Sequence, residues 1–212
     1  RREIHKILVD ITAKIQPYKE NIESLQELMS ELDVIRAKAY FAVNYNCSMP
    51  QLSKERQIYL REFVHPVLYH HHKKQHKPIV DNTIILDDKN RIVVISGPNA
   101  GGKSIILKSV GLIQLMFQFG MLIPAKENSV LSVFENLFVD IGDEQSIEND
   151  LSTYSSHLSN MNHFLSKANP KTLVLIDEMG MGTDPALGGP MAEAILENLH
   201  QMLFEIIHCR QF

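Results

Sequence analysis

The stretch from Gly97 to Ser104 limits what this chain can fold into more than any other. It reads Gly-Pro-Asn-Ala-Gly-Gly-Lys-Ser and fits the phosphate-loop pattern G-x-x-x-x-G-K-[ST]. A β-branched run at 91–96 predicts a buried strand before it, and an apolar run without proline at 105–119 predicts a helix after it. Because the motif needs a strand, a glycine-rich loop and a helix in that order, the sequence predicts a nucleotide-phosphate site, with an incidental glycine turn as the alternative.

The residue types in this loop suit ATP. Its glycines allow backbone conformations in which successive N–H groups point into one concavity, and the start of the helix adds its positive end. Lys103 would reach the β- and γ-phosphates, and the Ser104 hydroxyl would ligate Mg²⁺. The residues expected to contact the nucleotide are Gly97, Pro98, Asn99, Ala100, Gly101, Gly102, Lys103, Ser104 and Ile105.

A second signal is the run Leu-Val-Leu-Ile-Asp-Glu at 173–178. Four consecutive apolar residues predict a central strand that is buried on both faces, and ligands bind at the carboxyl edge where such strands end. Asp177 would hold the Mg²⁺, and Glu178 would be the catalytic acid–base group that polarises the attacking water, beside Lys103. The alternative is a strand that ends in two solvated acids.

Leu-Ser-Thr-Tyr-Ser-Ser-His at 151–157 precedes a helical run at 155–167. Ser152 and Thr153 are typical N-cap residues, but a helix start is also an anion site, so this segment could reach a γ-phosphate bound by another subunit. Upstream, residues 140–146 form an acidic loop in which Gln145 could lie near the metal.

Residues 1–46 have a helical pattern, with a break at Pro17 between 3–16 and a longer amphipathic helix. We interpret this segment as a pair of helices that packs on a neighbouring element; a recognition helix is the alternative. Elsewhere the patterns predict an edge strand at 57–63, an exposed cationic loop rather than a metal site in the histidine-rich run 70–78, and a hairpin of 83–86 and 91–95 around the turn 87–90.

The bulk composition is that of a globular protein without a membrane span. The chain has 212 residues, 44% of them hydrophobic and 22% charged, and a formal net charge of −4, so it lacks a global basic footprint for nucleic acid. Its two cysteines, Cys47 and Cys209, lack metal-ligand spacing and indicate idle thiols in a reducing, cytoplasmic setting. Because Arg1 is not an initiator methionine, we expect a fragment of a longer protein.

These motifs resemble those of the MutS ATPases, within the ABC superfamily. The phosphate loop with its Pro-Asn pair, the segment 151–157 and the run Asp-Glu-Met-Gly-Met-Gly-Thr-Asp-Pro at 177–185 all look like theirs. The Thr-Asp-Pro ending at 183–185 and the run Asp-Glu-Gln-Ser at 143–146 look less like the mismatch-repair MutS than like its second-type bacterial paralogue. That branch carries a C-terminal Smr nuclease domain.

The resemblance implies an α/β P-loop NTPase of ABC type, with a mostly parallel central sheet flanked by helices and preceded by an α-helical segment. Residues 1–46 would be the helical end of the MutS core domain, and 47–212 an ABC-type ATPase domain that is incomplete at its C-terminus. It also implies a head-to-tail homodimer in which ATP lies between the phosphate loop of one subunit and Ser152 of the other. DNA or ribosomes would bind through other parts of the full-length protein, and no nuclease activity is expected here.

One departure from the family pattern concerns the switch histidine. The Thr-Thr-His-Tyr-like motif that usually follows the next strand is missing, and His208 stands a few residues before its expected place. A non-hydrolysing, nucleotide-gated dimerisation module is therefore the main alternative to an ATPase. An ABC ATPase of a transporter is disfavoured because the segment 151–157 lacks Leu-Ser-Gly-Gly.

Overall fold

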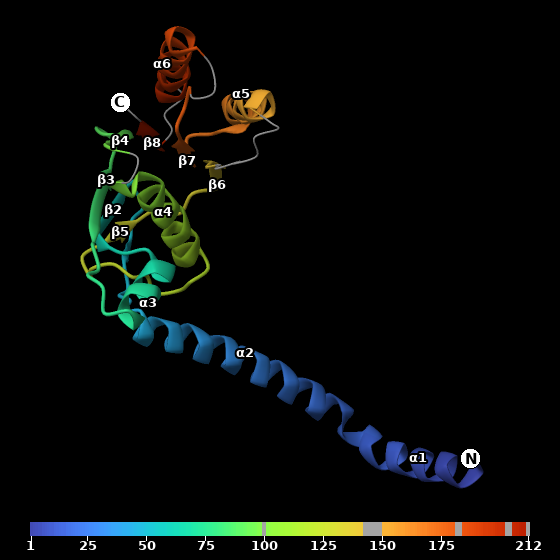
Figure 1. Cartoon of the computed structure of the whole chain (residues 1–212). Coiled ribbons are helices and arrows are strands. Elements are labelled where there is room, and N and C mark those ends of the chain that lie inside the picture. Colours follow the sequence, from blue (N-terminus) through green and yellow to red (C-terminus); the bar gives the residue numbers. More distant parts are fainter. Residues whose placement is uncertain (99–100, 142–149, 181–183, 202–204, 211–212) are drawn as a thin grey trace. The chain divides into compact units, whose positions relative to one another are not determined.

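The computed structural model (Figure 1) describes residues 1–98, 101–141, 150–180, 184–201 and 205–210. The chain divides into two compact units, Arg1–Asn44 and Tyr45–Phe212.

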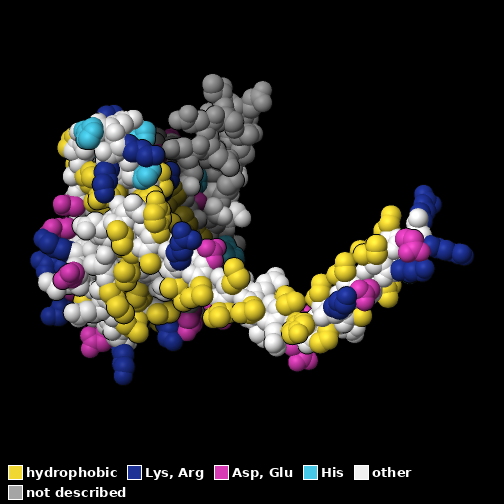
Figure 2. Space-filling view, turned by 90° about the horizontal axis from the view of Figure 1, so that it is seen from below, with side chains coloured by type: hydrophobic (Ala, Val, Ile, Leu, Met, Phe, Trp, Pro, Cys, Tyr) yellow, Lys and Arg dark blue, Asp and Glu magenta, His cyan; other side chains and the backbone are white. Residues whose placement is uncertain are grey.

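The first unit is helical throughout. It consists of α1 (Arg2–Ile15), a 3₁₀ turn η1 (Gln16–Tyr18) and α2 (Lys19–Asn44), so the predicted break at Pro17 is confirmed. The expected burial of the apolar face is not found: α1 buries no side chain and α2 buries only Ala42. Figure 2 shows apolar side chains along these helices. The exposed ones include Ile22, Leu25, Leu28, Met29, Leu32 and Ile35.

The second unit contains two sheets. The first has the order β1-β5-β2-β3, formed by β1 (Gln51–Leu52), β5 (Val130–Leu131), β2 (Ile58–Phe63) and β3 (Asn82–Leu86). The prediction of an edge strand at 57–63 is wrong, because β2 pairs antiparallel with both β3 and β5. Its alternation instead reflects one buried face, with Ile58 and Leu60 fully buried, and Phe63 is buried after a register shift between Leu60 and Phe63.

The histidine-rich run is not a loop. Helix α3 (Pro66–Lys74) includes His70, His71 and His72, and it begins with a proline at a position where the missing N–H costs no helical hydrogen bond. These side chains are largely exposed, and no group of three or more potential metal ligands occurs among the residues that the structure describes.

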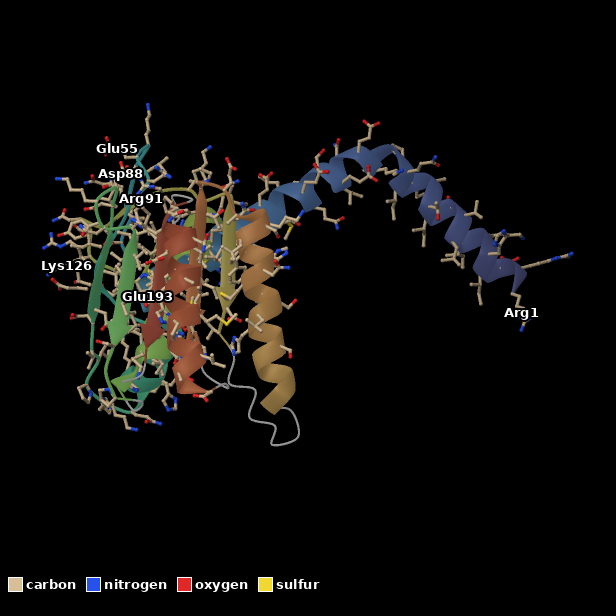
Figure 3. All side chains as sticks on the ribbon, turned by 90° about the horizontal axis from the view of Figure 1, so that it is seen from above. Arg1, Glu55, Asp88, Arg91, Lys126 and Glu193 are labelled. Carbon is tan, nitrogen blue, oxygen red and sulfur yellow. The ribbon has the colours of Figure 1, made fainter. Side chains whose placement is uncertain are left out.

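The predicted hairpin is also wrong. Its turn forms, with the Asp87 N–H donating to the Asn90 carbonyl at 3.1 Å and Arg91 lying 3.1 Å from the Asp88 carboxylate (Figure 3). However, β3 and β4 (Ile92–Ser96) belong to different sheets, since β3 pairs with β2 and β4 pairs with β8 (Glu205–Arg210).

The second sheet is entirely parallel among the described strands and has the order β4-β8-β7-β6. It confirms an α/β fold with a parallel sheet. Strand β7 (Thr172–Asp177) lies between β8 and β6 (Asn136–Asp140), and all six of its residues are buried, as its apolar run predicts. The strand predicted at 91–96 forms as β4, but it is not buried as expected, since β4 lies at the end of this order and Val94 is 50% exposed.

Helices cover both faces of this sheet (Figure 1). On one face lies α4 (Lys103–Gln118), which packs so closely that a Cβ atom at Gly111 would lie 2.7 Å from Leu175 Cδ1. On the other lie α5 (Asp150–Lys167) and α6 (Pro185–Gln201). This second layer encloses a core of Met161, Phe164, Val174, Ile176, Leu199 and Ile206. None of the described helices combines the length and apolar character needed to cross a membrane.

Candidate functional site

The glycine-rich loop joins β4 to α4 at the carboxyl edge of the parallel sheet. Gly102 is the N-cap residue of α4 and has a left-handed backbone, φ +79°, which glycine adopts without strain. No described side chain caps this helix, so its first N–H groups point outward without a side-chain acceptor. The Gly101 N–H donates to the Pro98 carbonyl at 2.9 Å. Asn99 and Ala100 lie outside the described residues.

Lys103 folds back over this loop. It is 5% exposed, and its ammonium donates to the carbonyl oxygens of Gly97 and Pro98 at 2.8 and 2.9 Å. It forms no ion pair with any described residue. Burying a cation without an anionic partner is costly, so this position is suited to an anion that arrives from outside the chain.

Asp177 and Glu178 lie where β7 ends. Asp177 is 7% exposed, and its Oδ1 is buried with no hydrogen-bond partner among the described residues. Glu178 has a φ of +52°, which is unusual for a residue with a side chain, and its N–H donates to the Cys209 carbonyl at 3.1 Å. An orphaned carboxylate oxygen and a strained backbone are both features that concentrate at functional sites.

The Cys209 thiol shows that these groups converge. Cys209 is the register partner of Asp177, and burial raises its pKa to about 12. The carboxylates of Asp177 and Glu178 raise that pKa further, while the Lys103 ammonium lowers it, so all three charges act on one buried sulfur. The structure therefore brings together Lys103, Asp177 and Glu178, which are distant in sequence.

A cavity of about 390 Å³ opens beside the loop. Gly101, Gly102 and Ile105 form one wall, and largely apolar or aromatic residues form the rest: Val64, His65, Leu68, Tyr69, His72, Ile79, Val80, Asn82, Ile106 and Ser109. Its size and lining suit a planar aromatic ring next to the glycine-rich loop.

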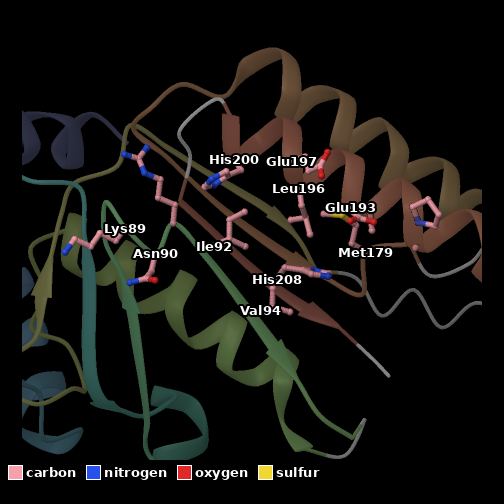
Figure 4. Close-up of a pocket in the computed structure, with 14 residues that line it drawn as sticks. Lys89, Asn90, Ile92, Val94, Met179, Glu193, Leu196, Glu197, His200 and His208 are labelled. Carbon is pink, nitrogen blue, oxygen red and sulfur yellow. The ribbon is translucent and has the colours of Figure 1, made fainter.

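His208 faces a different part of the domain. It lies inside β8, one residue before the register partner of Asp177, and is 2% exposed. Its side chain lines a second cavity of about 780 Å³ together with Val94 of β4 and Leu196 of α6 (Figure 4). Since successive side chains of a strand alternate between faces, His208 lies on the α6 side and Cys209 on the Lys103 side. This placement does not support His208 as the switch histidine.

The segment 151–157 lies within a helix. Because α5 begins at Asp150, Ser152 and Thr153 are internal helical residues, and the N-cap interpretation is wrong. The side chain of Ser152 lies outside the described residues, as does Gln145.

Sequence reasoning missed a contact between α5 and the sheet. Asp140 ends β6 instead of opening an acidic loop; its Oδ2 lies 2.7 Å from Nδ1 of His157, and its Oδ1 accepts from Nδ2 of Asn160 at 2.8 Å. The signal was present, since Leu-Phe-Val-Asp at 137–140 repeats the pattern of an apolar strand ending in an acid that is seen at 173–177.

Residues 93–211 match the sequence family described as MutS domain V, which is more than half of the chain. The chain belongs to this MutS family. Similar curated proteins include the proteins named endonuclease MutS2 of Pediococcus pentosaceus, 44% identical over 93% of this chain and 25% of the relative, and of Clostridium botulinum strain Langeland, 44% identical over 98% and 26%. The protein of the same name from Levilactobacillus brevis is 41% identical over 94% and 24%. This MutS domain V chain thus spans about a quarter of the length of these relatives.

Proposed function

We propose that this chain is the ATP-binding and ATP-hydrolysing region of a MutS2-like protein, an ABC-type P-loop ATPase that uses Mg²⁺. The observation that carries the proposal is the convergence of Lys103, Asp177 and Glu178 at the carboxyl edge of a parallel sheet, beside the uncapped start of α4. Phosphate binding at a helix start and catalysis by positioned charges are the chemistry that this arrangement supports.

The loop residues bind the phosphates. Backbone N–H groups between Gly97 and Ile105 face the anion, and Lys103 exchanges its two carbonyl acceptors for phosphate oxygens. Because carbonyl oxygens are neutral and phosphate oxygens are charged, this exchange gives the buried ammonium stronger hydrogen bonds. The adjacent 390 Å³ cavity receives the adenine ring.

The acidic residues fit a Mg²⁺ ion and a water nucleophile. Asp177 supplies a buried oxygen without a described partner and Ser104 a hydroxyl, and Mg²⁺ binds through such oxygen ligands together with phosphate oxygens and water. When bound, the ion neutralises phosphate charge. Glu178 orients the attacking water and accepts its proton.

The second half of each site comes from another copy. We propose a head-to-tail homodimer in which the α5 segment that contains Ser152 contacts the γ-phosphate held by the opposite subunit. DNA or ribosomes are proposed to bind through regions of the longer protein outside this chain. The relatives' printed name, endonuclease, is not extended to this segment.

A second function is favoured by the position of His208. Because this histidine lies on the α6 face of the sheet, the chain shows no switch histidine at the site among its described residues. A nucleotide-gated dimerisation module, which binds ATP without hydrolysing it, would have the phosphate-binding residues but no switch histidine.

Turnover measured against protein concentration separates these functions. For an ATPase with composite sites, activity per subunit rises with concentration and is lost in Lys103→Ala and in Glu178→Gln, while Glu178→Gln still binds ATP. Lys108→Ala on the exposed side of α4 and the exposed Glu127→Gln are matched controls and retain activity. ATP binding without turnover at any concentration would support the dimerisation module, and an absence of ATP binding would refute both.

A further inference from the structure

Both oxygens of the buried Asp140 carboxylate accept hydrogen bonds from helix α5. We call this contact of Asp140 with His157 and Asn160 the clasp. The carboxylate is 6% exposed, it accepts from His157 and Asn160, and these two residues are three positions apart on one face of the helix. Since an ionised carboxylate only accepts hydrogen bonds, both contacts run from the helix to the strand end. Two donors one turn apart determine both the height and the rotation of α5 at this point.

Further along the helix, apolar side chains of α5 pack on the sheet. Phe164 stacks on Phe138 of β6 with ring centroids 5.1 Å apart, and Met161 and Phe164 enter the core beside Val174. Apolar contacts of this kind are not directional, so they hold the helix against the sheet without fixing its rotation. The clasp lies on the side of these contacts nearer Ser152, which precedes His157 by five residues, or roughly 7.5 Å along the axis at ~1.5 Å per residue.

The clasp also lies beside the segment that follows Glu178. Asp140 and His157 line a small cavity of about 20 Å³ together with Met179 and Gly180, which come directly after Glu178. The end of β6 that holds α5 therefore lies close to the residues that follow Glu178.

We propose that Asp140 is a positioning residue, which through His157 and Asn160 holds the α5 segment containing Ser152 in the orientation that the opposite subunit's ATP requires. This proposal rests on the proposed ATP-bridged dimer. It gives Asp140 no contact with ATP bound in its own subunit, so the effect of its removal appears in trans.

The test is ATP-dependent dimerisation of the full chain in a Glu178→Gln background, which binds ATP without turning it over. We expect Asp140→Ala to weaken dimerisation at least tenfold by sedimentation while the dissociation constant of ATP from the monomer changes less than twofold. Asp140→Asn, which keeps the shape and can still accept from Asn160, should have a smaller effect in the same direction. It is the variant to use if Asp140→Ala fails to fold.

Glu135, one residue before β6, provides a matched control. Its carboxylate also accepts two hydrogen bonds, one of them from an asparagine: from Lys171 at 2.8 Å and Asn169 at 3.0 Å, but at the opposite end of the strand. Glu135→Ala should leave dimerisation unchanged. An equal effect of Glu135→Ala would show that any lost strand-end contact suffices, and would overturn the proposal.

Mixing two variants tests the action in trans. In that background, Lys103→Ala lacks a working phosphate loop and Asp140→Ala lacks the clasp, but a head-to-tail mixed dimer retains one site with both halves intact. ATP-dependent association should therefore return on mixing. No recovery, unweakened dimerisation of the Asp140 variants, or parallel loss of monomer ATP affinity would refute the proposal. Failure of the Glu178→Gln chain itself to bind ATP would refute the proposed function instead.

Discussion

Replacing Gly180 by alanine tests how the loop that follows Glu178 is held. Gly180 has a φ of +84°, and a Cβ atom at this position would lie 2.6 Å from the carbonyl oxygen of Gly188 in α6. The left-handed conformation costs a residue with a side chain about 1–2 kcal/mol. Overpacking against a backbone atom, which cannot rotate away, costs about 1–3 kcal/mol more.

The lower chain entropy of alanine in the unfolded state returns about 0.4–1 kcal/mol. The net expectation is a loss of about 1–4.6 kcal/mol in the free energy of unfolding, which for a domain of this size lowers Tm by about 2–18 °C. Gly189→Ala is the control: its Cβ meets no atom within 4 Å, and the helix propensity of alanine is offset by the following Pro190, so the change should stay within about 0.5 kcal/mol.

Thermal and urea unfolding of the two variants measure these differences. A Gly180→Ala protein that melts within about 1 °C of the parent chain would refute the close approach of this loop to α6. At temperatures below its Tm the folded variant should have Glu178 displaced with the loop. Its ATP turnover should then fall more than its ATP binding.

Three further predictions concern the site and the core. ATP at a hundred times its dissociation constant should stabilise the chain by about 2.7 kcal/mol. Differential scanning calorimetry should show that Lys103→Ala loses this stabilisation. If the variant keeps it, the proposed ATP site at Lys103 is contradicted. Because the folded-state pKa of Cys209 is raised to about 12, its contribution to stability is present below the unfolded pKa near 9 and is lost as the pH rises toward 12. Urea unfolding between pH 9 and 11 should therefore show a decline that is steeper than that of Cys209→Ala by up to about 1.4 kcal/mol per pH unit; equal slopes would contradict it. Leu175→Ala removes a fully buried side chain opposite Gly111 and should cost about 2–5 kcal/mol in urea unfolding, so a loss below 1 kcal/mol would contradict the tight packing of α4.

Features that depend on neighbouring residues could be predicted from the sequence. The apolar run before Asp177 is buried on both faces, the run after the glycine-rich loop is helical, and Pro17 interrupts the first helices. Each rests on a local rule: the side-chain period of a helix or strand, or the fixed geometry of proline.

Features that depend on remote partners could not. The residues of β2 alternate like those of an edge strand, yet β5 lies on its second side, and β4 leaves its expected hairpin because β8 offers a parallel partner more than a hundred residues later. The histidine-rich segment is polar enough for a loop but lies in α3. The backbone N–H and C=O groups of a strand can form hydrogen bonds with any adjacent strand. The composition of a strand therefore carries little information about which strand will be its partner.

The candidate site shows the same division. The sequence alone determined that a glycine-rich loop stands before a helix and that an apolar strand ends in two acids, because each motif is a continuous run with its own local geometry. Only the tertiary structure decided that Lys103, Asp177 and Glu178 meet at one edge of the sheet beside Cys209, and that Asp140 holds His157 and Asn160. Parallel strands bring their carboxyl ends to one edge whatever their separation in sequence, so these contacts arise from the order of the strands in the sheet.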